Sequence, residues 1–195
     1  MKGIQSLFLR AKHWQILVLF FALWLFSYFV GDIYTSIWLT SSGVVANTAL
    51  LLSLLSIAPL WASYLLWFWS MGSFLVRLAG PSRRPSENLF WLSLVYPCFY
   101  LVVFTELVQI AQSSWVILIL PFHFFAIFCM LYIIYFVAQC LAQAETGRKA
   151  VISDYLGPFI LFWFFPIGIW FTQPRINRLY AKRQDVAAAQ EPVAG

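Results

Sequence analysis

Two ionisable residues, Glu106 and His123, lie inside long apolar segments and are the first candidates for chemistry in this sequence. A charged side chain within a membrane costs about 3 kcal/mol on insertion scales, so such residues often mark functional sites. A turn centred near Ser113 would place Glu106 seven residues before it and His123 ten residues after it, at similar depth on antiparallel helices. The pair could relay a proton or bind a ligand. We favour a structural explanation, either a hydrogen-bonded clasp between helices or a glutamate that reaches the outer interface.

Other residue patterns that carry chemistry are absent from the sequence. The two histidines lie in separate regions without an HExxH motif or flanking acidic clusters, so we expect no metal site. There is no GxSxG elbow, P-loop or GxGxxG run. A phosphatase or lipid-transferase site would need several acidic residues near basic ones, and acidic residues outside the C-terminal tail are scarce. We therefore predict no catalytic residue and no cofactor, and an intramembrane enzyme is the weakest functional hypothesis.

The composition identifies lipid as the solvent of this chain. Of 195 residues, 63% are hydrophobic and 10% are charged, with a mean hydropathy of +0.83. Soluble domains contain about 45–50% apolar and about 25% charged residues. The net charge of +5 does not indicate nucleic-acid binding, because every Lys and Arg lies in a short segment beside an apolar run. The cysteines all lie within apolar runs and are expected to be reduced and buried.

The elements that must position these residues are apolar helices. We predict an all-α integral membrane bundle in a single domain, residues 1–184, because a span needs roughly 20 apolar residues. The predicted spans are residues 14–30, 50–76, 89–111 and 115–141. A fifth apolar segment, residues 155–171, is shorter and contains Pro166 and Gly168, which disfavour an unbroken helix.

The distribution of basic residues indicates whether the fifth segment crosses the membrane. With five crossings, eight of the twelve Lys and Arg residues would face the cytoplasm and four the exterior. If the fifth segment does not cross, all twelve lie on the cytoplasmic side. Because Lys and Arg in short loops favour the cytoplasm, we predict four spans with both termini cytoplasmic. Five spans, the last kinked at its proline, is the alternative.

The fifth segment and the residues after it are predicted to lie at the cytoplasmic surface. Two short helices that meet near Pro166 and Gly168 would form a re-entrant hairpin, and one interfacial helix is the alternative. Pro174 then begins a basic amphipathic helix, residues 174–184. Its basic side chains, suited to anionic headgroups, are Arg175, Arg178 and Lys182, opposite Ile176, Leu179 and Tyr180. Residues 185–195 are expected to be disordered.

Three short runs carry a resemblance to a known group of proteins. They are KHWQ (residues 12–15), ETGRK (residues 145–149) and FFPIGIWFTQPRIN (residues 164–177). The chain resembles small, uncharacterised multi-pass membrane proteins of bacteria, in which a closely similar PIGIWF-x-QPRIN run follows the last apolar segment. The resemblance implies a bacterial inner (plasma) membrane location. It brings no activity, so no functional residue is carried over.

Two functional hypotheses therefore remain ahead of an enzyme. The favoured one is an accessory or scaffold protein whose cytoplasmic face binds lipid or a partner, either another membrane protein or a second copy of this chain. The alternative is a small transporter or channel subunit, in which the PIGIW segment lines a path past Glu106 and His123.

Overall fold

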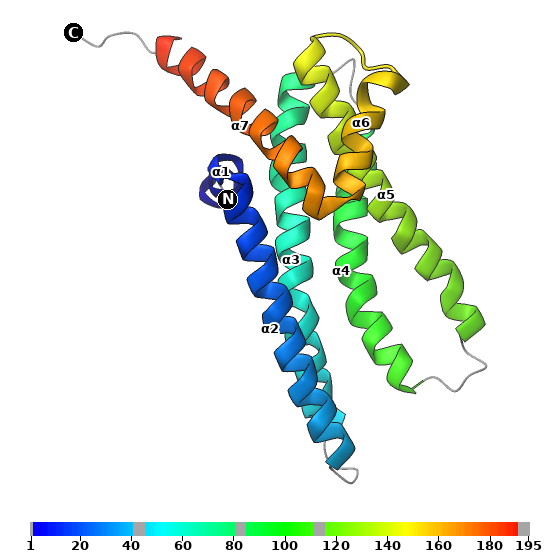
Figure 1. Ribbon diagram of the computed structural model, residues 1–195. Coiled ribbons are helices and arrows are strands. Elements are labelled where there is room, and N and C mark those ends of the chain that lie inside the picture. Colours follow the sequence, from blue (N-terminus) through cyan, green and yellow to red (C-terminus); the bar gives the residue numbers. More distant parts are fainter. Residues whose placement is uncertain (1, 41–45, 81–84, 111–115, 191–195) are drawn as a thin grey trace. The chain divides into compact units, whose positions relative to one another are not determined.

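The computed structural model describes residues 2–40, 46–80, 85–110 and 116–190, and within these ranges all regular structure is helical (Figure 1). The side chains of residues 2, 34, 35, 37–40, 46–54, 104–110 and 116 are outside the description. The helical structure of the described residues confirms the all-α prediction. The helices are α1 (Lys2–Arg10), α2 (His13–Thr40), α3 (Ala46–Ala79), α4 (Glu87–Ile110), α5 (Val116–Thr146), α6 (Ile152–Trp163) and α7 (Phe165–Gln190).

Two helices within the described ranges are long and apolar enough to cross a membrane. They are residues His13–Ile33 of α2 and Ile117–Thr146 of α5. Only 11% and 22% of their most apolar stretches are buried inside the protein. The central helix of a soluble protein would be mostly buried, so these exposed apolar surfaces favour a lipid surrounding. A shorter apolar stretch, Glu87–Val103, lies in α4.

The helix bounds differ from the predicted spans mainly at their ends. The helix that contains the first predicted span continues past Gly31 and Asp32 to Thr40, where the sequence predicted a loop. A single glycine costs a helix only about 1 kcal/mol, which is too little to end it. Helix α5 continues to Thr146 and ends at Gly147, whose φ of 67° is the left-handed conformation typical of a helix C-terminus.

The packed residues divide into two compact units, each built from separate parts of the chain. One unit contains Met1–Leu17, Trp67–Ser86 and Ile134–Gly195, and we call it the terminal unit. The other contains Val18–Leu66 and Glu87–Ile133. Helices α2, α3 and α5 each contribute to both. In the second unit, Tyr96 packs edge-on against Phe125 with ring centroids 4.6 Å apart.

Helices α6 and α7 form a hairpin in the terminal unit (Figure 1). Phe164 separates them, with φ −86° and ψ 57°, and its N–H donates to the carbonyl of Ile160 at 2.9 Å. The break therefore lies at Phe164, just before the predicted pair Pro166 and Gly168. Pro166 falls in the first turn of α7, where its missing N–H would have had no helical partner.

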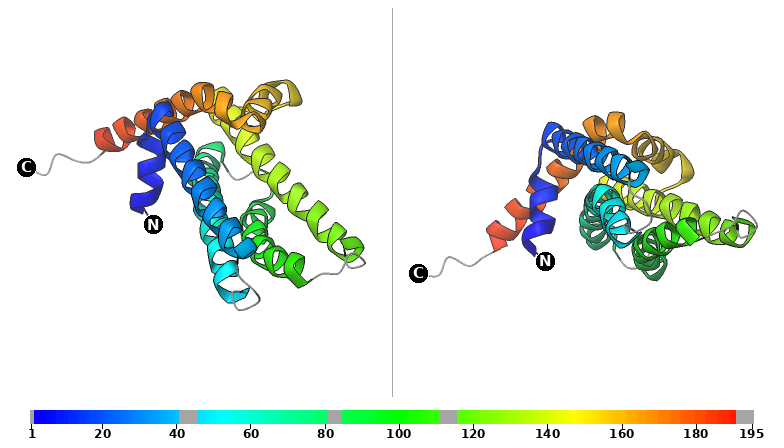
Figure 2. Two further views of the ribbon diagram at one scale, coloured as in Figure 1. Left: turned by 60° about the horizontal axis from the view of Figure 1, so that its bottom comes forward. Right: turned by 90° about the horizontal axis from the view of Figure 1, so that it is seen from below.

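Helix α7 is longer than the sequence predicts. Pro174 lies inside it and does not begin a new helix, and residues 185–190, expected to be disordered, are helical. The Ala-rich run that ends at Gln190 has high helix propensity, which supports the continuation. Residues 191–195 lie outside the described ranges. Helix α1, which was not predicted, turns away from α2 and lies beside α7 (Figure 2).

Candidate functional site

The side chain of Gln173 joins three segments of the terminal unit. It is fully buried on α7, and its Oε1 accepts a hydrogen bond of 3.2 Å from Nε1 of Trp67 on α3. Its Nε2 donates to the carbonyls of Phe8 at 2.8 Å and Ala11 at 3.2 Å. These carbonyls belong to the last turn of α1, where main-chain acceptors lack helical partners. Gln173 therefore caps α1 while it anchors α7 to α3.

Asn177, one turn after Gln173, completes this cap. Its Nδ2 donates to the Ala11 carbonyl at 3.0 Å, and its Oδ1 accepts from Nε2 of Gln173 at 2.9 Å. On the other side of the turn, Oε1 of Gln15 accepts from the Lys12 N–H at 2.8 Å and caps the start of α2. The turn between α1 and α2 is thus held by side chains from both directions.

A buried aromatic cluster lies around the Gln173 amide. Trp67 packs edge-on against Phe165, with ring centroids 5.3 Å apart, and against Phe162 at 6.0 Å. Phe68 packs against Phe162 at 5.7 Å. Aromatic pairs at these distances contribute about 0.5–1.5 kcal/mol each beyond area burial. The cluster fixes the α6–α7 hairpin against α3.

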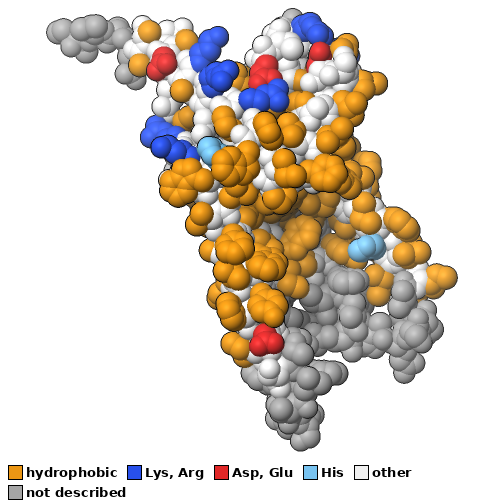
Figure 3. Space-filling view, viewed as in Figure 1, with side chains coloured by type: hydrophobic (Ala, Val, Ile, Leu, Met, Phe, Trp, Pro, Cys, Tyr) orange, Lys and Arg blue, Asp and Glu red, His pale blue; other side chains and the backbone are white. Residues whose placement is uncertain are grey.

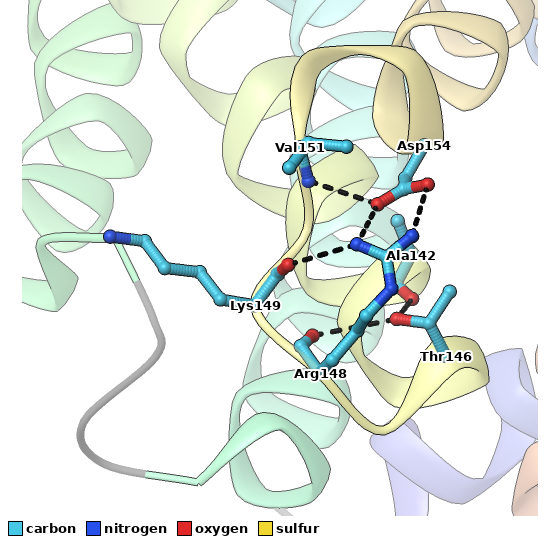
Figure 4. A network of polar contacts seen from close by, with 6 residues as sticks. All are labelled: Ala142, Thr146, Arg148, Lys149, Val151 and Asp154. Carbon is cyan, nitrogen blue, oxygen red and sulfur yellow. Dashed lines mark hydrogen bonds and ion pairs between the residues drawn. The ribbon is translucent and has the colours of Figure 1, made fainter.

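The loop between α5 and α6 is closed by Arg148 and Asp154 (Figure 4). The Arg148 guanidinium contacts both carboxylate oxygens of Asp154 at 2.9 Å. Oδ2 of Asp154 also accepts the Val151 N–H at 2.9 Å, which caps the start of α6. The Val151 N–H, followed by the Arg148 guanidinium, lowers the pKa of Asp154 below its ordinary value. Helix α6 begins at Ile152, three residues before the predicted apolar segment, and Asp154 in its first turn caps it.

An ion pair connects this loop region to α7. Arg175 binds Glu145 through two parallel contacts, with Nε 2.7 Å from Oε1 and the second guanidinium nitrogen against Oε2. Bidentate geometry of this kind is the strongest arrangement of an arginine and a carboxylate. Both side chains are about 30% exposed, at 31% and 29%. Arg175, predicted as one of the lipid-surface residues, is thus paired within the protein.

The other two predicted basic residues, Arg178 and Lys182, are exposed on α7. They lie on one face of α7, which we call its outer face. This face carries exposed apolar side chains near the hairpin and the two basic residues farther along the helix. With spacings of three or four residues, this outer face of α7 comprises Ile167, Phe171, Pro174, Arg178 and Lys182. The opposite side carries the buried Ile176 and the half-buried Leu179 and Tyr180, as the sequence predicted. In Figure 3, Lys and Arg side chains lie along the outer half of α7 and hydrophobic side chains cover the hairpin.

The structure describes the side chain of only one residue of the predicted pair, Glu106 and His123. Glu106 lies on α4, but its side chain is outside the description, so the pairing remains a prediction. His123 is exposed on α5, and its Nδ1 is 2.8 Å from the hydroxyl oxygen of Tyr100 on α4. The sequence analysis missed this tyrosine. Among the described residues, no group of three or more His, Cys, Asp or Glu side chains is placed to hold a metal ion.

The sequence patterns also did not predict the contacts of Gln173, Asn177 and Glu145, although the sequence contains a signal that could have located these residues. All three residues lie in the runs on which the resemblance rests, and the third run, KHWQ, supplies His13. The His13 ring packs on Trp170 with centroids 4.4 Å apart. The runs are therefore neighbours in the terminal unit. No family model, curated protein or solved structure matches this chain.

Proposed function

We propose that the protein is a four-span accessory or scaffold protein of the bacterial inner membrane, with both termini in the cytoplasm. Its cytoplasmic face would be formed by α1, the α5–α6 loop and α7. The lateral surfaces of α2 and α5, apolar and largely exposed, support insertion in lipid. The terminal unit supports a binding role, because its polar contacts fix three separate segments in one arrangement while its basic residues remain at the surface.

The outer face of α7 carries this proposal. Helix α6 has 12 residues, and at 1.5 Å per residue it extends about 18 Å, too short for about 30 Å of hydrocarbon. The chain then turns back, so the hairpin would enter the membrane without crossing it. Ile167 and Phe171 would lie at acyl-chain depth, and Arg178 and Lys182 would reach anionic headgroups. Each basic residue at an anionic surface contributes about 1 kcal/mol.

A topology measurement tests the proposal directly. A reporter fused after Gly195, with paired versions that are active only in the cytoplasm or only outside it, should give a cytoplasmic signal in a bacterial host. An exterior signal would establish a fifth crossing and overturn the arrangement. Labelling of single cysteines with an impermeant maleimide adds a second measurement: a cysteine at Ser153 and one at Gln184 should both react only from the cytoplasmic side.

The lipid contact is tested by charge removal at two positions. In nanodiscs, anionic lipid should raise the thermal stability of the native protein, and the double variant Arg178→Gln/Lys182→Gln should lose most of that gain. Arg183→Gln is the matched control, since Arg183 is also exposed but lies off this face. An equal loss in the control would show that only total charge matters.

Flux measurements distinguish a scaffold from a transporter. In proteoliposomes that contain a pH-sensitive dye, a scaffold should leave an imposed proton gradient intact. A proton flux that Glu106→Gln and His123→Ala both abolish would replace the scaffold proposal with the transporter.

A further inference from the structure

Helix α1 is fixed on its inner side by α3 and α7. Phe8 and Leu9 are buried, and Nε2 of Gln5 donates to the hydroxyl of Ser73 on α3 at 2.9 Å. Arg77, also on α3, donates to Oε1 of Gln5 at 3.1 Å. Together with the Gln173 cap at its C-terminal end, these contacts define the orientation of α1 against α3 and α7. The residues on the opposite side of α1, which we call its outer side, therefore point away from α3 and α7.

That outer side carries exposed apolar side chains. Ile4 and Leu7, one turn apart, are 51% and 63% exposed. Arg10 follows one turn later and is exposed; its guanidinium lies 5.9 Å from the ring centroid of Tyr180 and donates to Oε1 of Gln184 at 3.3 Å. Lys12 is exposed in the turn, and Trp14 is exposed at the start of α2. Apolar residues flanked by basic ones are typical of a helix at a membrane surface.

The position of α1 in the chain sets its depth. The apolar stretch of α2 begins at His13, only three residues after the last residue of α1. A chain of three residues spans at most about 11 Å. If α2 crosses the membrane, the C-terminal end of α1 lies near the headgroups, and the contacts of α1 with α3 and α7 orient the rest of the helix.

We infer that α1 is an interfacial helix that rests on the anionic leaflet. Ile4 and Leu7 enter the boundary between headgroups and acyl chains, and Arg10 and Lys12 contact lipid phosphates. This inference rests on the proposed function, since it requires α2 to span the membrane. A bilayer fits better than a second protein, because exposed apolar side chains lie on both sides of Arg10 and Lys12, at Ile4 and Leu7 on α1 and at Trp14 at the start of the candidate span, and the charges between them are positive.

The test places a fluorescent probe on α1 of the full chain. Cys98, Cys129 and Cys140 are replaced, and one cysteine that carries an environment-sensitive dye is introduced at Leu7, Ile167 or Ala187. The protein is reconstituted at one copy per nanodisc, with lipids that carry a spin label just below the headgroup. A dye at Leu7 should show a blue-shifted emission and lose intensity to the spin label, whereas a dye at Ala187, exposed near the end of α7, should do neither.

The possible outcomes separate the inference from the proposed function. Quenching at Ile167 but not at Leu7 would overturn the interfacial role of α1 and leave the hairpin proposal intact. No quenching at either position would overturn both. A blue shift at Leu7 without quenching would mean that protein covers α1, which also overturns the inference.

The basic residues require a separate comparison. Quenching at Leu7 should increase when anionic lipid replaces neutral lipid, and Arg10→Gln/Lys12→Gln should abolish that increase. An increase of the same size in the double variant would overturn the contact of Arg10 and Lys12 with phosphate. The protein that retains Arg10 and Lys12 and carries the dye at position 7 is the reference in each lipid mixture.

Discussion

Gly168 on α7 lies directly against the main-chain carbonyl of Leu161 on α6. A Cβ built on Gly168 would overlap the carbonyl oxygen of Leu161 and would stand 3.2 Å from its Cα. Because these neighbours are backbone atoms, they cannot rotate away as a side chain would. The hairpin can close this tightly only because residue 168 has no side chain.

Gly168→Ala should therefore open the crossing of α6 and α7. The expected loss is about 1–3 kcal/mol of unfolding free energy, the usual cost of forcing atoms into a packed site. It should appear as a lower midpoint of thermal unfolding in detergent and as faster proteolysis at the hairpin.

Gly157→Ala is the matched control on the same hairpin. Gly157 lies inside α6, and outside its own helix and its chain neighbours a Cβ there would meet nothing within 4 Å. Alanine is favoured over glycine in a helix by about 1 kcal/mol, but the ring of Pro158 crowds a Cβ on the residue before it, so this variant should be close to neutral. If both substitutions destabilise the protein equally, the close contact at Leu161 is not the cause.

Gln173→Leu should release α1 from α7. Leucine has a similar volume but leaves the Trp67 N–H and the carbonyls of Phe8 and Ala11 without this partner. A buried polar group that loses its hydrogen bond costs about 1–3 kcal/mol. Hydrogen exchange should accelerate over residues 2–11, while exchange in the middle of α5 stays unchanged.

Gln184→Leu serves as the comparison for the Gln173 variant. Gln184 also contacts α1, through Arg10, but it is exposed on the last turns of α7. Exposed substitutions usually change stability by no more than about 0.5 kcal/mol. Equal acceleration of exchange in both variants would contradict a special role for the buried amide.

Gln173 is buried and Gln184 is exposed, and the sequence alone does not distinguish them. Composition and apolar runs predicted the all-α class, because burial in lipid or protein requires continuous apolar length. They could not predict the Gln173 network, because its partners are main-chain carbonyls more than 160 positions away in the sequence. Nor could charge counting show that Arg175 is paired, since Glu145 lies 30 residues away and is adjacent only in the folded chain.

The sequence predicted a break between two short helices but not the residue at which the break lies. Pro166 and Gly168 indicated a break, and the structure places the break at Phe164. Proline is tolerated in the first turn of a helix, so Pro166 favours the start of α7 and not its interruption. The function of Gly168 depends on how closely Leu161 approaches, which is a tertiary contact that no local pattern encodes.

The cap of α6 should depend on pH through Asp154. The folded protein lowers the pKa of this carboxyl from its ordinary value of 3.8, with the Val151 N–H as the main cause. A lowered pKa stabilises the folded state above the unfolded pKa, and this contribution is lost as the pH falls through the folded value. The unfolding midpoints of the native protein and Asp154→Asn should therefore differ at pH 6 and converge only as the pH falls below the ordinary carboxyl value of 3.8 toward the lowered folded pKa.

Arg148→Gln separates the two causes of this effect. It removes the guanidinium but keeps the Val151 N–H, which is the larger influence on the carboxyl. Most of the pH dependence should therefore remain in Arg148→Gln. If it disappears, the ion pair and not the helix cap controls Asp154.

The ion pair between Arg175 and Glu145 should show a measurable but small coupling. A double-mutant cycle with Arg175→Gln, Glu145→Gln and both together isolates the pair from the effects of each residue alone. Since both side chains are about 30% exposed, at 31% and 29%, we expect about 0.5–1 kcal/mol, at the upper end of surface pairs because the geometry is bidentate. Arg175→Lys should retain only part of it, because an ammonium cannot make two parallel contacts. The coupling should shrink in high salt; a value that salt does not change would show that the two residues act through packing and not through charge.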